Sequence, residues 1–249
     1  MAFVETKVTA RRDWAEGLFS LQLAAEAPAF EPGQWLRLAK TLAGERVARS
    51  YSIASAPGAP LELFIVTTPG GALTPALAAL REGDPVEIDP TPYGFFTLRY
   101  LPEARDLWLL ATGTGLAPFL SMLRSGELWP RFERVVLAHG VRRAVDLAYR
   151  EELYAVAETH PLRYLPFTTR ETVAGLGHGR LDAALESGDL EEHAGMALDP
   201  ARSHLMLCGN PGMLASVTEA AQRRGLRKHR TRKPGHITSE AYWEAPRVP

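Results

Sequence analysis

The chain has 249 residues, of which 46% are hydrophobic, and its formal net charge is −1. Its single cysteine, Cys208, excludes an internal disulfide framework and an iron–sulfur cluster or zinc ion held by four thiolates. No apolar run approaches the roughly 20 residues of a membrane span, and the net charge gives no global field for nucleic acid. The N-terminus lacks the apolar segment of a signal peptide, so we expect a cytoplasmic protein without membrane or nucleic-acid partners.

The first hundred residues predict short antiparallel strands, because strand-length segments are separated by Gly, Pro and acidic turn residues. This spacing is typical of an antiparallel barrel or sandwich. One helix is expected to interrupt the strands, with Thr74 as its N-cap and Pro75 in its first turn. The predicted strands are residues 5–14, 18–24, 34–40, 49–55, 61–67 and 84–90.

Beyond residue 101 the pattern changes to buried apolar strands that alternate with helices, which indicates a parallel sheet with crossover helices. We therefore predict two domains, an antiparallel β-barrel over residues 1–101 and a parallel-sheet α/β domain over residues 102–249. The strands expected in the second domain are residues 106–115, 134–141, 162–170 and 204–212, and the helices are 116–126, 146–160, 179–190 and 212–225.

Two glycine-rich turns follow predicted strands of the second domain. In "LLATGTGLAPFL" a strand runs into Gly113, Thr114 and Gly115 and then opens a helix, a combination that favours a phosphate group. A second turn follows Cys208 in "CGNPGML". Ligands of open α/β sheets bind at such strand ends, so both turns could face one ligand. The alternatives are two ordinary tight turns and a cysteine that is only a small buried side chain.

Arginines also follow the strands of the second domain, at positions where a guanidinium could bind a phosphate with two hydrogen bonds. A 2′-phosphate on an adenosine ribose is the natural ligand for them, which favours NADP over NAD. Solvated surface arginines are the alternative. The residues are Arg142, Arg143, Arg170 and Arg180.

The stretch "VARSYSIASAP" alternates in the manner of a strand with two different faces. Arg49 and Tyr51 share one face, and Ser50 and Ser52 share the other. Together with the glycine-rich turn "GGALTP", Arg49 suggests a second anion site, in the barrel. A barrel strand with a surface arginine is the alternative.

Taken in order, seven motifs cover nearly the whole chain: "RSYSIAS", "GGALTP", "ATGTGLAPFLSML", "HGVRRAVDLAY", "TTRETVAGLGHGRL", "CGNPGML" and "SEAYW". With these motifs the sequence resembles the ferredoxin/flavodoxin–NADP⁺ reductase family, in its bacterial branch. The resemblance implies an FAD-binding barrel (residues 1–101) and an NADP-binding α/β domain (residues 102–249) whose C-terminal tail covers the flavin.

The resemblance also implies roles for single residues of the barrel. Arg49 would bind the FAD pyrophosphate, Tyr51 would lie against the isoalloxazine, and Ser52 would lie near the flavin N5. Backbone groups and a helix N-terminus would complete the FAD site. The further FAD-binding residues are Ser50, Ile65, Val66, Thr67, Ala72, Leu73 and Thr74.

In the second domain, Thr114 is similar to the family residue that meets both cofactors. Arg142, Arg170 and Arg180 match the positions that recognise the 2′-phosphate. The aromatic residues Tyr242 and Trp243 would cover the flavin, and Tyr242 is the preferred stacking residue. Because the chain continues beyond them to Pro249, the resemblance does not decide which of the two stacks on the flavin. Ser52, Thr114 and Tyr242 are the expected catalytic residues.

The implied activity is hydride transfer between NADPH and FAD, followed by single-electron transfer to ferredoxin or flavodoxin, in a monomer. No metal site is expected, because the seven histidines lack metal-binding spacing. The basic run 222–233 would attract an acidic carrier, or be only a solvated helix end. Alternative functions are an NAD(P)H-dependent oxygenase reductase component, a flavin reductase, and a regulatory module that senses a nucleotide or a flavin.

Overall fold

Residues 3–24 and 29–241 are described by the computed structural model, and contacts divide the chain into two units. The first unit contains the residues up to Leu98 together with Ala117–Gly126, and the second contains Arg99–Leu116 and the residues from Glu127 onward. Helix α2 (Ala117–Ser125) thus groups with the first unit, although a strand of the second unit precedes it in the chain. The domain limits 1–101 and 102–249 stay a prediction.

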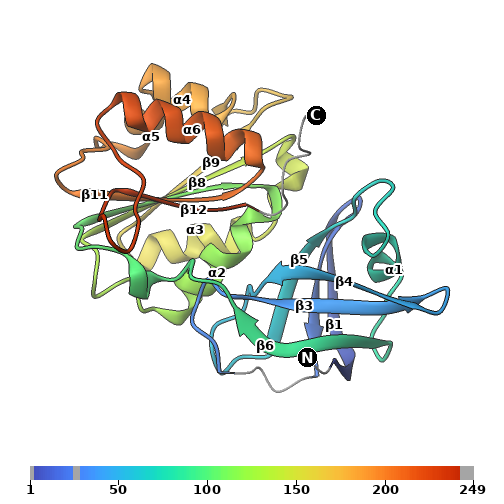
Figure 1. The fold of residues 1–249 in the computed structure, drawn as a ribbon. Helices are drawn as coiled ribbons and strands as arrows, with labels where there is room; N and C mark the ends of the chain where they lie inside the picture. Colours follow the sequence, from blue (N-terminus) through green and yellow to red (C-terminus); the bar gives the residue numbers. More distant parts are fainter. Residues whose placement is uncertain (1–2, 25–28, 242–249) are drawn as a thin grey trace, which may run out of the picture. The chain divides into compact units, whose positions relative to one another are not determined.

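The first unit is a six-stranded antiparallel barrel, as predicted (Figure 1). Its strand order is β4-β3-β6-β1-β2-β5, and the two end strands meet where Ile53 pairs with Leu63. Next to this bridge, the Ala54 N–H donates to the Glu62 carbonyl at 2.8 Å. The strands are β1 (Val4–Ala15), β2 (Leu18–Leu23), β3 (Trp35–Leu42), β4 (Glu45–Ser52), β5 (Leu61–Val66) and β6 (Pro85–Tyr93).

Helix α2 is fastened to the barrel beside this closing bridge. The Ser121 hydroxyl donates to the Ser55 carbonyl at 2.7 Å. Arg124 donates to the Ala54 carbonyl at 2.9 Å and forms an ion pair with Glu62 at 3.1 Å. Both side chains of that pair are largely buried, so solvent screens their attraction less than it would on the surface.

The predicted N-cap of the barrel's helix is wrong. Helix α1 spans Thr74–Ala78, so Thr74 is its first residue and Leu73 occupies the N-cap position without a side-chain hydrogen bond. The Thr74 hydroxyl instead accepts from the Thr68 N–H at 2.9 Å, which closes the preceding glycine turn. The hydroxyl is therefore used to fold the turn and does not cap the helix.

The second unit is a six-stranded parallel sheet with the order β10-β9-β8-β7-β11-β12. Strands β8, β9 and β10 follow β7 in order on one side of it, and β11 then lies on the other side of β7. The strand order therefore reverses between β7 and β11. The strands are β7 (Asp106–Thr112), β8 (Arg134–Val141), β9 (Leu162–Thr168), β10 (Gly177–His178), β11 (Ser203–Gly209) and β12 (Ile237–Ala241).

Helices cover both faces of this sheet (Figure 1). One face packs against α4 (Leu181–Ser187), α5 (Asp189–Ala194) and α6 (Pro211–Arg223) through a core that includes Trp108 and Leu207. Helix α3 (Arg150–Thr159) lies on the other face, where the rings of Tyr154 and Tyr164 contact edge to face. Within the described part of the chain, no helix is long and apolar enough to cross a membrane.

Strand β12 was not predicted from the sequence. Its five residues, ITSEA, carry only one fully buried side chain, Ile237, so the segment lacks the apolar run that marks the other strands. It forms because β11 has an open edge, and every residue from Ile237 to Ala241 pairs with β11. This strand becomes important for the candidate site.

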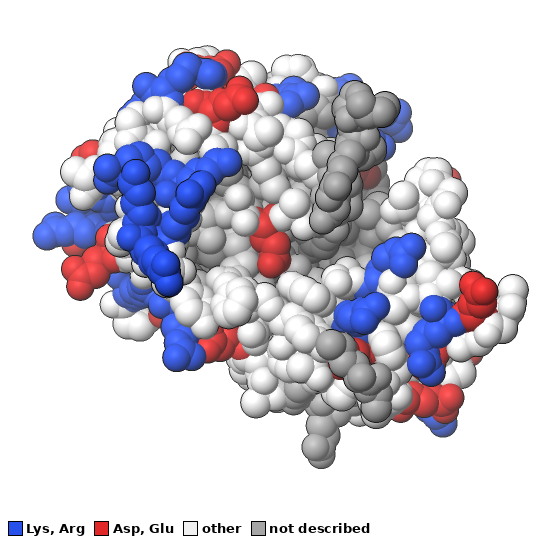
Figure 2. All heavy atoms as spheres, viewed as in Figure 1, with Lys and Arg blue, Asp and Glu red and all other residues white. Residues whose placement is uncertain are grey.

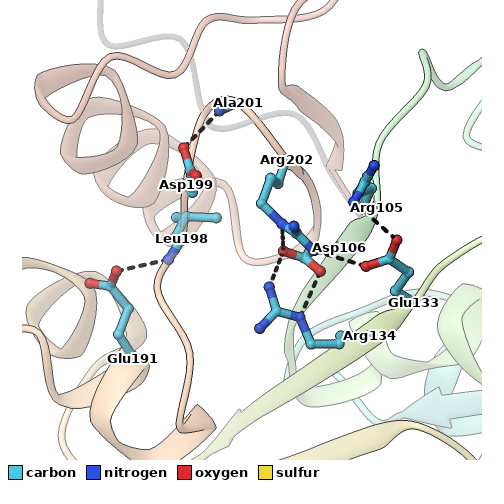
Figure 3. A network of polar contacts seen from close by, with 9 residues as sticks. All are labelled: Arg105, Asp106, Glu133, Arg134, Glu191, Leu198, Asp199, Ala201 and Arg202. Carbon is cyan, nitrogen blue, oxygen red and sulfur yellow. Dashed lines mark hydrogen bonds and ion pairs between the residues drawn. The ribbon is translucent and has the colours of Figure 1, made fainter.

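A charged network joins the amino ends of the three central strands (Figure 3). Asp106, the first residue of β7, is fully buried and accepts two hydrogen bonds from Arg134 at 2.8 and 2.5 Å. Arg202 contacts the same carboxylate at 3.3 Å and also donates to Glu133 at 2.9 Å. Burial raises the pKa of Asp106, but the hydrogen bonds from the two arginines outweigh burial and lower it overall.

Asp106→Asn is therefore expected to lower the free energy of unfolding by about 2–3 kcal/mol at pH 7, because two arginines lose a charged partner. A native pKa below the ordinary value means that this contribution is present above about pH 4 and is lost as the pH falls through the native pKa. Urea unfolding of both proteins at several pH values measures the difference.

The matched control is Asp13→Asn, which breaks the ion pair between Asp13 and Arg11. The side chain of Asp13 is 66% exposed. The expected cost of this substitution is below about 0.5 kcal/mol. Equal losses for Asp106→Asn and Asp13→Asn would show that the network at the strand ends adds no stability.

Candidate cofactor-binding site

The strands that close the barrel diverge on one side of their shared bridge. Ile53 pairs with Leu63, and among the described residues this is the only bridge between β4 and β5. Continuing its antiparallel register places Tyr51 opposite Ile65 and Arg49 opposite Thr67. The residues predicted to bind FAD on the two strands thus lie on the two sides of one open seam.

Backbone groups also face this seam. The Ala54 N–H donates across the seam to Glu62, whereas the Thr67 N–H donates away from it, to the Gly17 carbonyl just before β2. Because backbone groups alternate in direction along a strand, the N–H and C=O of Ser50 and Val66 are directed toward the seam. A ligand lying along the seam can therefore be hydrogen-bonded by the main chain.

The side chains at the end of β4 differ in burial. Arg49 is exposed, and its Nη1 donates to the Ala48 carbonyl at 2.7 Å. Tyr51 is only 8% exposed, and burial raises the pKa of its phenol to about 12 although the charge of Arg49 acts in the opposite direction. Ser52 is buried as well. The strand thus presents an exposed cation beside a buried, neutral ring.

The side chains of five further predicted FAD residues differ in their exposure. Ile65 and Leu73 are buried in the barrel core, so only their backbone can contact a ligand. Val66 and Ala72 are exposed. The buried hydroxyl of Thr67 has no hydrogen-bond partner among the described residues.

In the second unit, the two predicted glycine turns contact each other at the reversal point between β7 and β11. A Cβ on Gly115 would lie 2.3 Å from the Cys208 carbonyl oxygen, and one on Gly209 would lie 2.2 Å from the Thr112 hydroxyl. The Thr112 hydroxyl also accepts from the Asn210 N–H at 3.0 Å. Only glycine fits at these two positions, because the two turns lie against each other.

The reversal point lies at the carboxyl ends of β7 and β11, where open α/β sheets bind their ligands. The chain enters a 3-10 turn at Gly113–Leu116, and Gly113 has a left-handed φ of 53°. Helix α6 begins on the other side, with Asn210 as N-cap accepting from Gly212 at 2.7 Å. Thr114 is largely buried within the first of these turns.

A row of side chains crosses the sheet just before these ends. Ala111 pairs with His139 on one side and with Cys208 on the other, and Cys208 pairs with Glu240 on β12. Residues in register on parallel strands point to the same face. Two titratable groups, Cys208 and Glu240, are therefore neighbours at this edge, and His139 lies two strands from Cys208.

Burial decides the charge of these groups. It raises the pKa of the Cys208 thiol well above its ordinary value, with a further contribution from Glu240, so the thiol stays neutral. Burial also raises the pKa of Glu240 to about 7. Glu240 was not singled out from the sequence, although it lies within the quoted motif "SEAYW", because its strand was not predicted.

The three predicted phosphate-binding arginines follow neighbouring strands. Arg142 follows β8, Arg170 follows β9, and Arg180 comes two residues after β10. The Arg170 N–H donates to the Arg142 carbonyl at 2.9 Å, and all three residues are exposed. Arg180 forms an ion pair with Asp182 at 3.0 Å. The fold therefore collects these cations at the carboxyl edge of one half of the sheet.

The basic run lies elsewhere. Arg223 and Arg224 pair with Glu186 and Glu191. Beyond them, residues 225–236 connect α6 to the amino end of β12, which is the edge opposite the glycine turns. Figure 2 shows Lys and Arg gathered over this connection. Steering of a carrier toward the cofactor edge is therefore not supported by the position of this run.

Two predicted residues, Tyr242 and Trp243, lie outside the described residues. Within the described ranges, no group of three His, Cys, Asp or Glu residues is arranged to hold a metal ion.

Two protein families match the chain in succession. An oxidoreductase FAD-binding domain matches residues 2–97, and an oxidoreductase NAD-binding domain matches residues 109–219. The first match covers the barrel strands, and the second covers the sheet from β7 as far as α6. The matches agree with the fold of each unit.

Whole-length relatives have the same order of domains. A flavodoxin/ferredoxin–NADP reductase of Escherichia coli is 41% identical over 97% of this chain and 99% of its own length. A ferredoxin–NADP reductase of Azotobacter vinelandii is 35% identical over 94% of this chain and 95% of its own. The crystal structure of a ferredoxin NADP⁺ reductase from Neisseria gonorrhoeae with bound FAD and NADP is 31% identical, with a TM-score of 0.92 over 97% of this chain and 99% of that one. The chain therefore belongs to the flavodoxin/ferredoxin–NADP reductase family.

Proposed function

We propose that this protein transfers electrons between NADPH and a one-electron carrier protein, ferredoxin or flavodoxin, by way of FAD. The observation that carries the proposal is the carboxyl edge of the second sheet, where two interlocked glycine turns adjoin three arginines on neighbouring strand ends. When bound, FAD accepts a hydride from NADPH and releases its electrons one at a time.

The barrel seam fits FAD. The exposed guanidinium of Arg49 would bind the pyrophosphate, and Tyr51 would lie against the isoalloxazine with Ser52 near its N5. Backbone groups of Ser50 and Val66 would hydrogen-bond along the seam. The remaining proposed FAD contacts come from Ile65, Thr67, Ala72, Leu73 and Thr74.

The edge of the second sheet fits NADP. The backbone at Gly113 can approach a dinucleotide closely, because a Cβ at this position would meet no other atom within 4 Å. Thr114 would lie at the nicotinamide. Arg142, Arg170 and Arg180 would bind the 2′-phosphate, for which exposed guanidinium groups are well suited.

Protein groups at this edge position the cofactors and control the local charge. Hydride transfer itself needs no general acid, and the buried thiol of Cys208 stays neutral because burial raises its pKa. Glu240 can exist in both protonation states near neutral pH. Ser52, Thr114 and Tyr242 are the residues that we propose to touch the reacting rings.

The partners follow from the relatives, whose names specify ferredoxin and flavodoxin. We propose the same carriers here, with NADPH as the nucleotide. A monomeric state and a cytoplasmic location complete the proposal.

Reduction of the flavin tests the function directly. In an anaerobic mixture with one equivalent of nucleotide, NADPH is expected to bleach the flavin absorbance rapidly and NADH slowly. Faster reduction by NADH would favour an oxygenase-type reductase. A protein that takes up FAD but is reduced by neither nucleotide would favour a regulatory role, and a protein that cannot take up FAD would contradict the proposal.

Removing single arginines tests the 2′-phosphate site. Arg142→Gln and Arg170→Gln should each raise the KM for NADPH by about tenfold or more, because each loses a charge-assisted hydrogen bond. The KM for NADH, which lacks the phosphate, should stay within about twofold. Arg163→Gln is the control, since Arg163 is also exposed but lies near the amino end of β9. A similar rise for all three variants would point to a general charge effect.

The raised pKa of Glu240 gives a prediction for stability. The native state holds this proton up to about pH 7, whereas the unfolded chain releases it near pH 4.5. The free energy of unfolding should therefore fall as the pH rises between these values, by up to about 3 kcal/mol. In Glu240→Gln this component of the slope should disappear, and denaturant unfolding at pH 5 and pH 8 measures it. Identical slopes in the two proteins would show that Glu240 titrates normally.

A further inference from the structure

His139 lies next to the first glycine turn, and it was not singled out from the sequence although it begins the quoted motif "HGVRRAVDLAY". It is on β8, its side chain is fully buried, and it belongs to the row that contains Ala111 and Cys208. Its Nε2 lies 3.0 Å from the carbonyl oxygen of Gly113. The contact joins the end of β8 to the turn that follows β7.

The chemistry of this contact determines the state of the ring. A carbonyl oxygen can only accept a hydrogen bond, so Nε2 must carry the proton and donate it. Burial lowers the pKa of His139 to about 4, although the hydrogen bond to Gly113 acts in the opposite direction. The ring is therefore neutral at physiological pH, and Nδ1 carries a lone pair.

That lone pair makes histidine a costly choice for packing alone. Nδ1 is buried and has no hydrogen-bond partner among the described residues. A buried acceptor without a partner costs free energy that an apolar side chain of similar size would avoid. The benefit of a histidine at this position must therefore come from its other nitrogen, through the bond to Gly113.

The bond to Gly113 sets the orientation of one peptide plane. In a trans peptide the carbonyl of one residue and the N–H of the next point in opposite directions. By holding the Gly113 oxygen toward β8, His139 directs the Thr114 N–H away from β8. Gly113 itself restricts this plane less than another residue would, because glycine adopts its left-handed φ of 53° and many other conformations with little strain.

We propose that His139 is a positioning residue that holds the Gly113–Thr114 peptide in the orientation required to bind the nicotinamide half of NADP(H). The inference rests on the proposed function, in which this turn receives the nucleotide. Different groups of the protein would then bind the two halves of NADP(H). The adenosine 2′-phosphate half would be held by arginines after β8, β9 and β10, which do not depend on the orientation of this peptide.

The experiment compares two ligands on the FAD-loaded protein, NADP⁺ and 2′-phospho-AMP, by titration calorimetry. His139→Leu removes the donor at a similar volume, and His139→Gln retains an N–H at about the place of Nε2. We expect His139→Leu to weaken NADP⁺ binding by about tenfold and to leave 2′-phospho-AMP binding within twofold. His139→Gln should recover most of the loss, and the rate of flavin reduction by NADPH should follow the same order.

His204→Leu is the matched control. His204 is also fully buried, its Nε2 lies 2.9 Å from the Thr238 hydroxyl, and its Nδ1 likewise has no partner among the described residues. It pairs with Leu107 near the amino end of the sheet, away from the glycine turns. A general loss of packing should affect this variant as much as His139→Leu, whereas loss of positioning should not.

Unchanged NADP⁺ binding in His139→Leu would overturn the inference, and so would equal weakening of both ligands. If His139→Leu does not fold, His139→Asn replaces it, because its shorter amide cannot reach Gly113; equal NADP⁺ affinity in the Asn and Gln variants would then overturn the inference. The proposed function is tested separately by the wild-type protein, which must bind NADP⁺ in the same titration.

Discussion

The close contact between two backbone turns is the constraint on which the candidate site depends. Gly115 lies against the Cys208 carbonyl, and Gly209 lies against Thr112, with no room for a side chain at either place. Because β7 and β11 are neighbours where the strand order reverses, both turns end at one edge of the sheet. The arginines after β8, β9 and β10, and the row that ends in Glu240, take their positions from the same strand order.

The two edges of the second sheet have different chemistry. At the amino edge, fully charged groups form a dense network around the buried carboxylate of Asp106. At the carboxyl edge, the buried groups next to the glycine turns are neutral or near their titration point, since burial disfavours charge on His139, Cys208 and Glu240. Permanent positive charge at that edge belongs to exposed arginines. A charged ligand can thus enter an edge whose interior carries little fixed charge of its own.

Much of the fold could be predicted from the sequence, because the barrel strands and the alternating second half each follow a clear hydrophobic period. The two glycine turns and the candidate arginines Arg142 and Arg170 could also be located, since each follows a buried strand. The register between the strands could not be predicted. Cys208 lies beside Glu240 because β12 pairs with β11. The sequence of β12 is polar and only five residues long, so it gives no hydrophobic pattern from which this pairing could be predicted. Thr74 shows a similar limit, because a threonine before a helix can fold the preceding turn as readily as it caps the helix.

The attachment of helix α2 to the barrel has a consequence for how such proteins can be recombined. Ser121 and Arg124 fasten this helix to Ser55, Ala54 and Glu62, although strand β7 and the first glycine turn precede it in the chain. Neither unit is therefore a single uninterrupted stretch of sequence. A chimera that joins this barrel to the nucleotide domain of a relative at one crossover near residue 100 would carry a foreign α2 against the closing bridge. Retaining the native helix requires two further crossovers, one before Ala117 and one after Gly126.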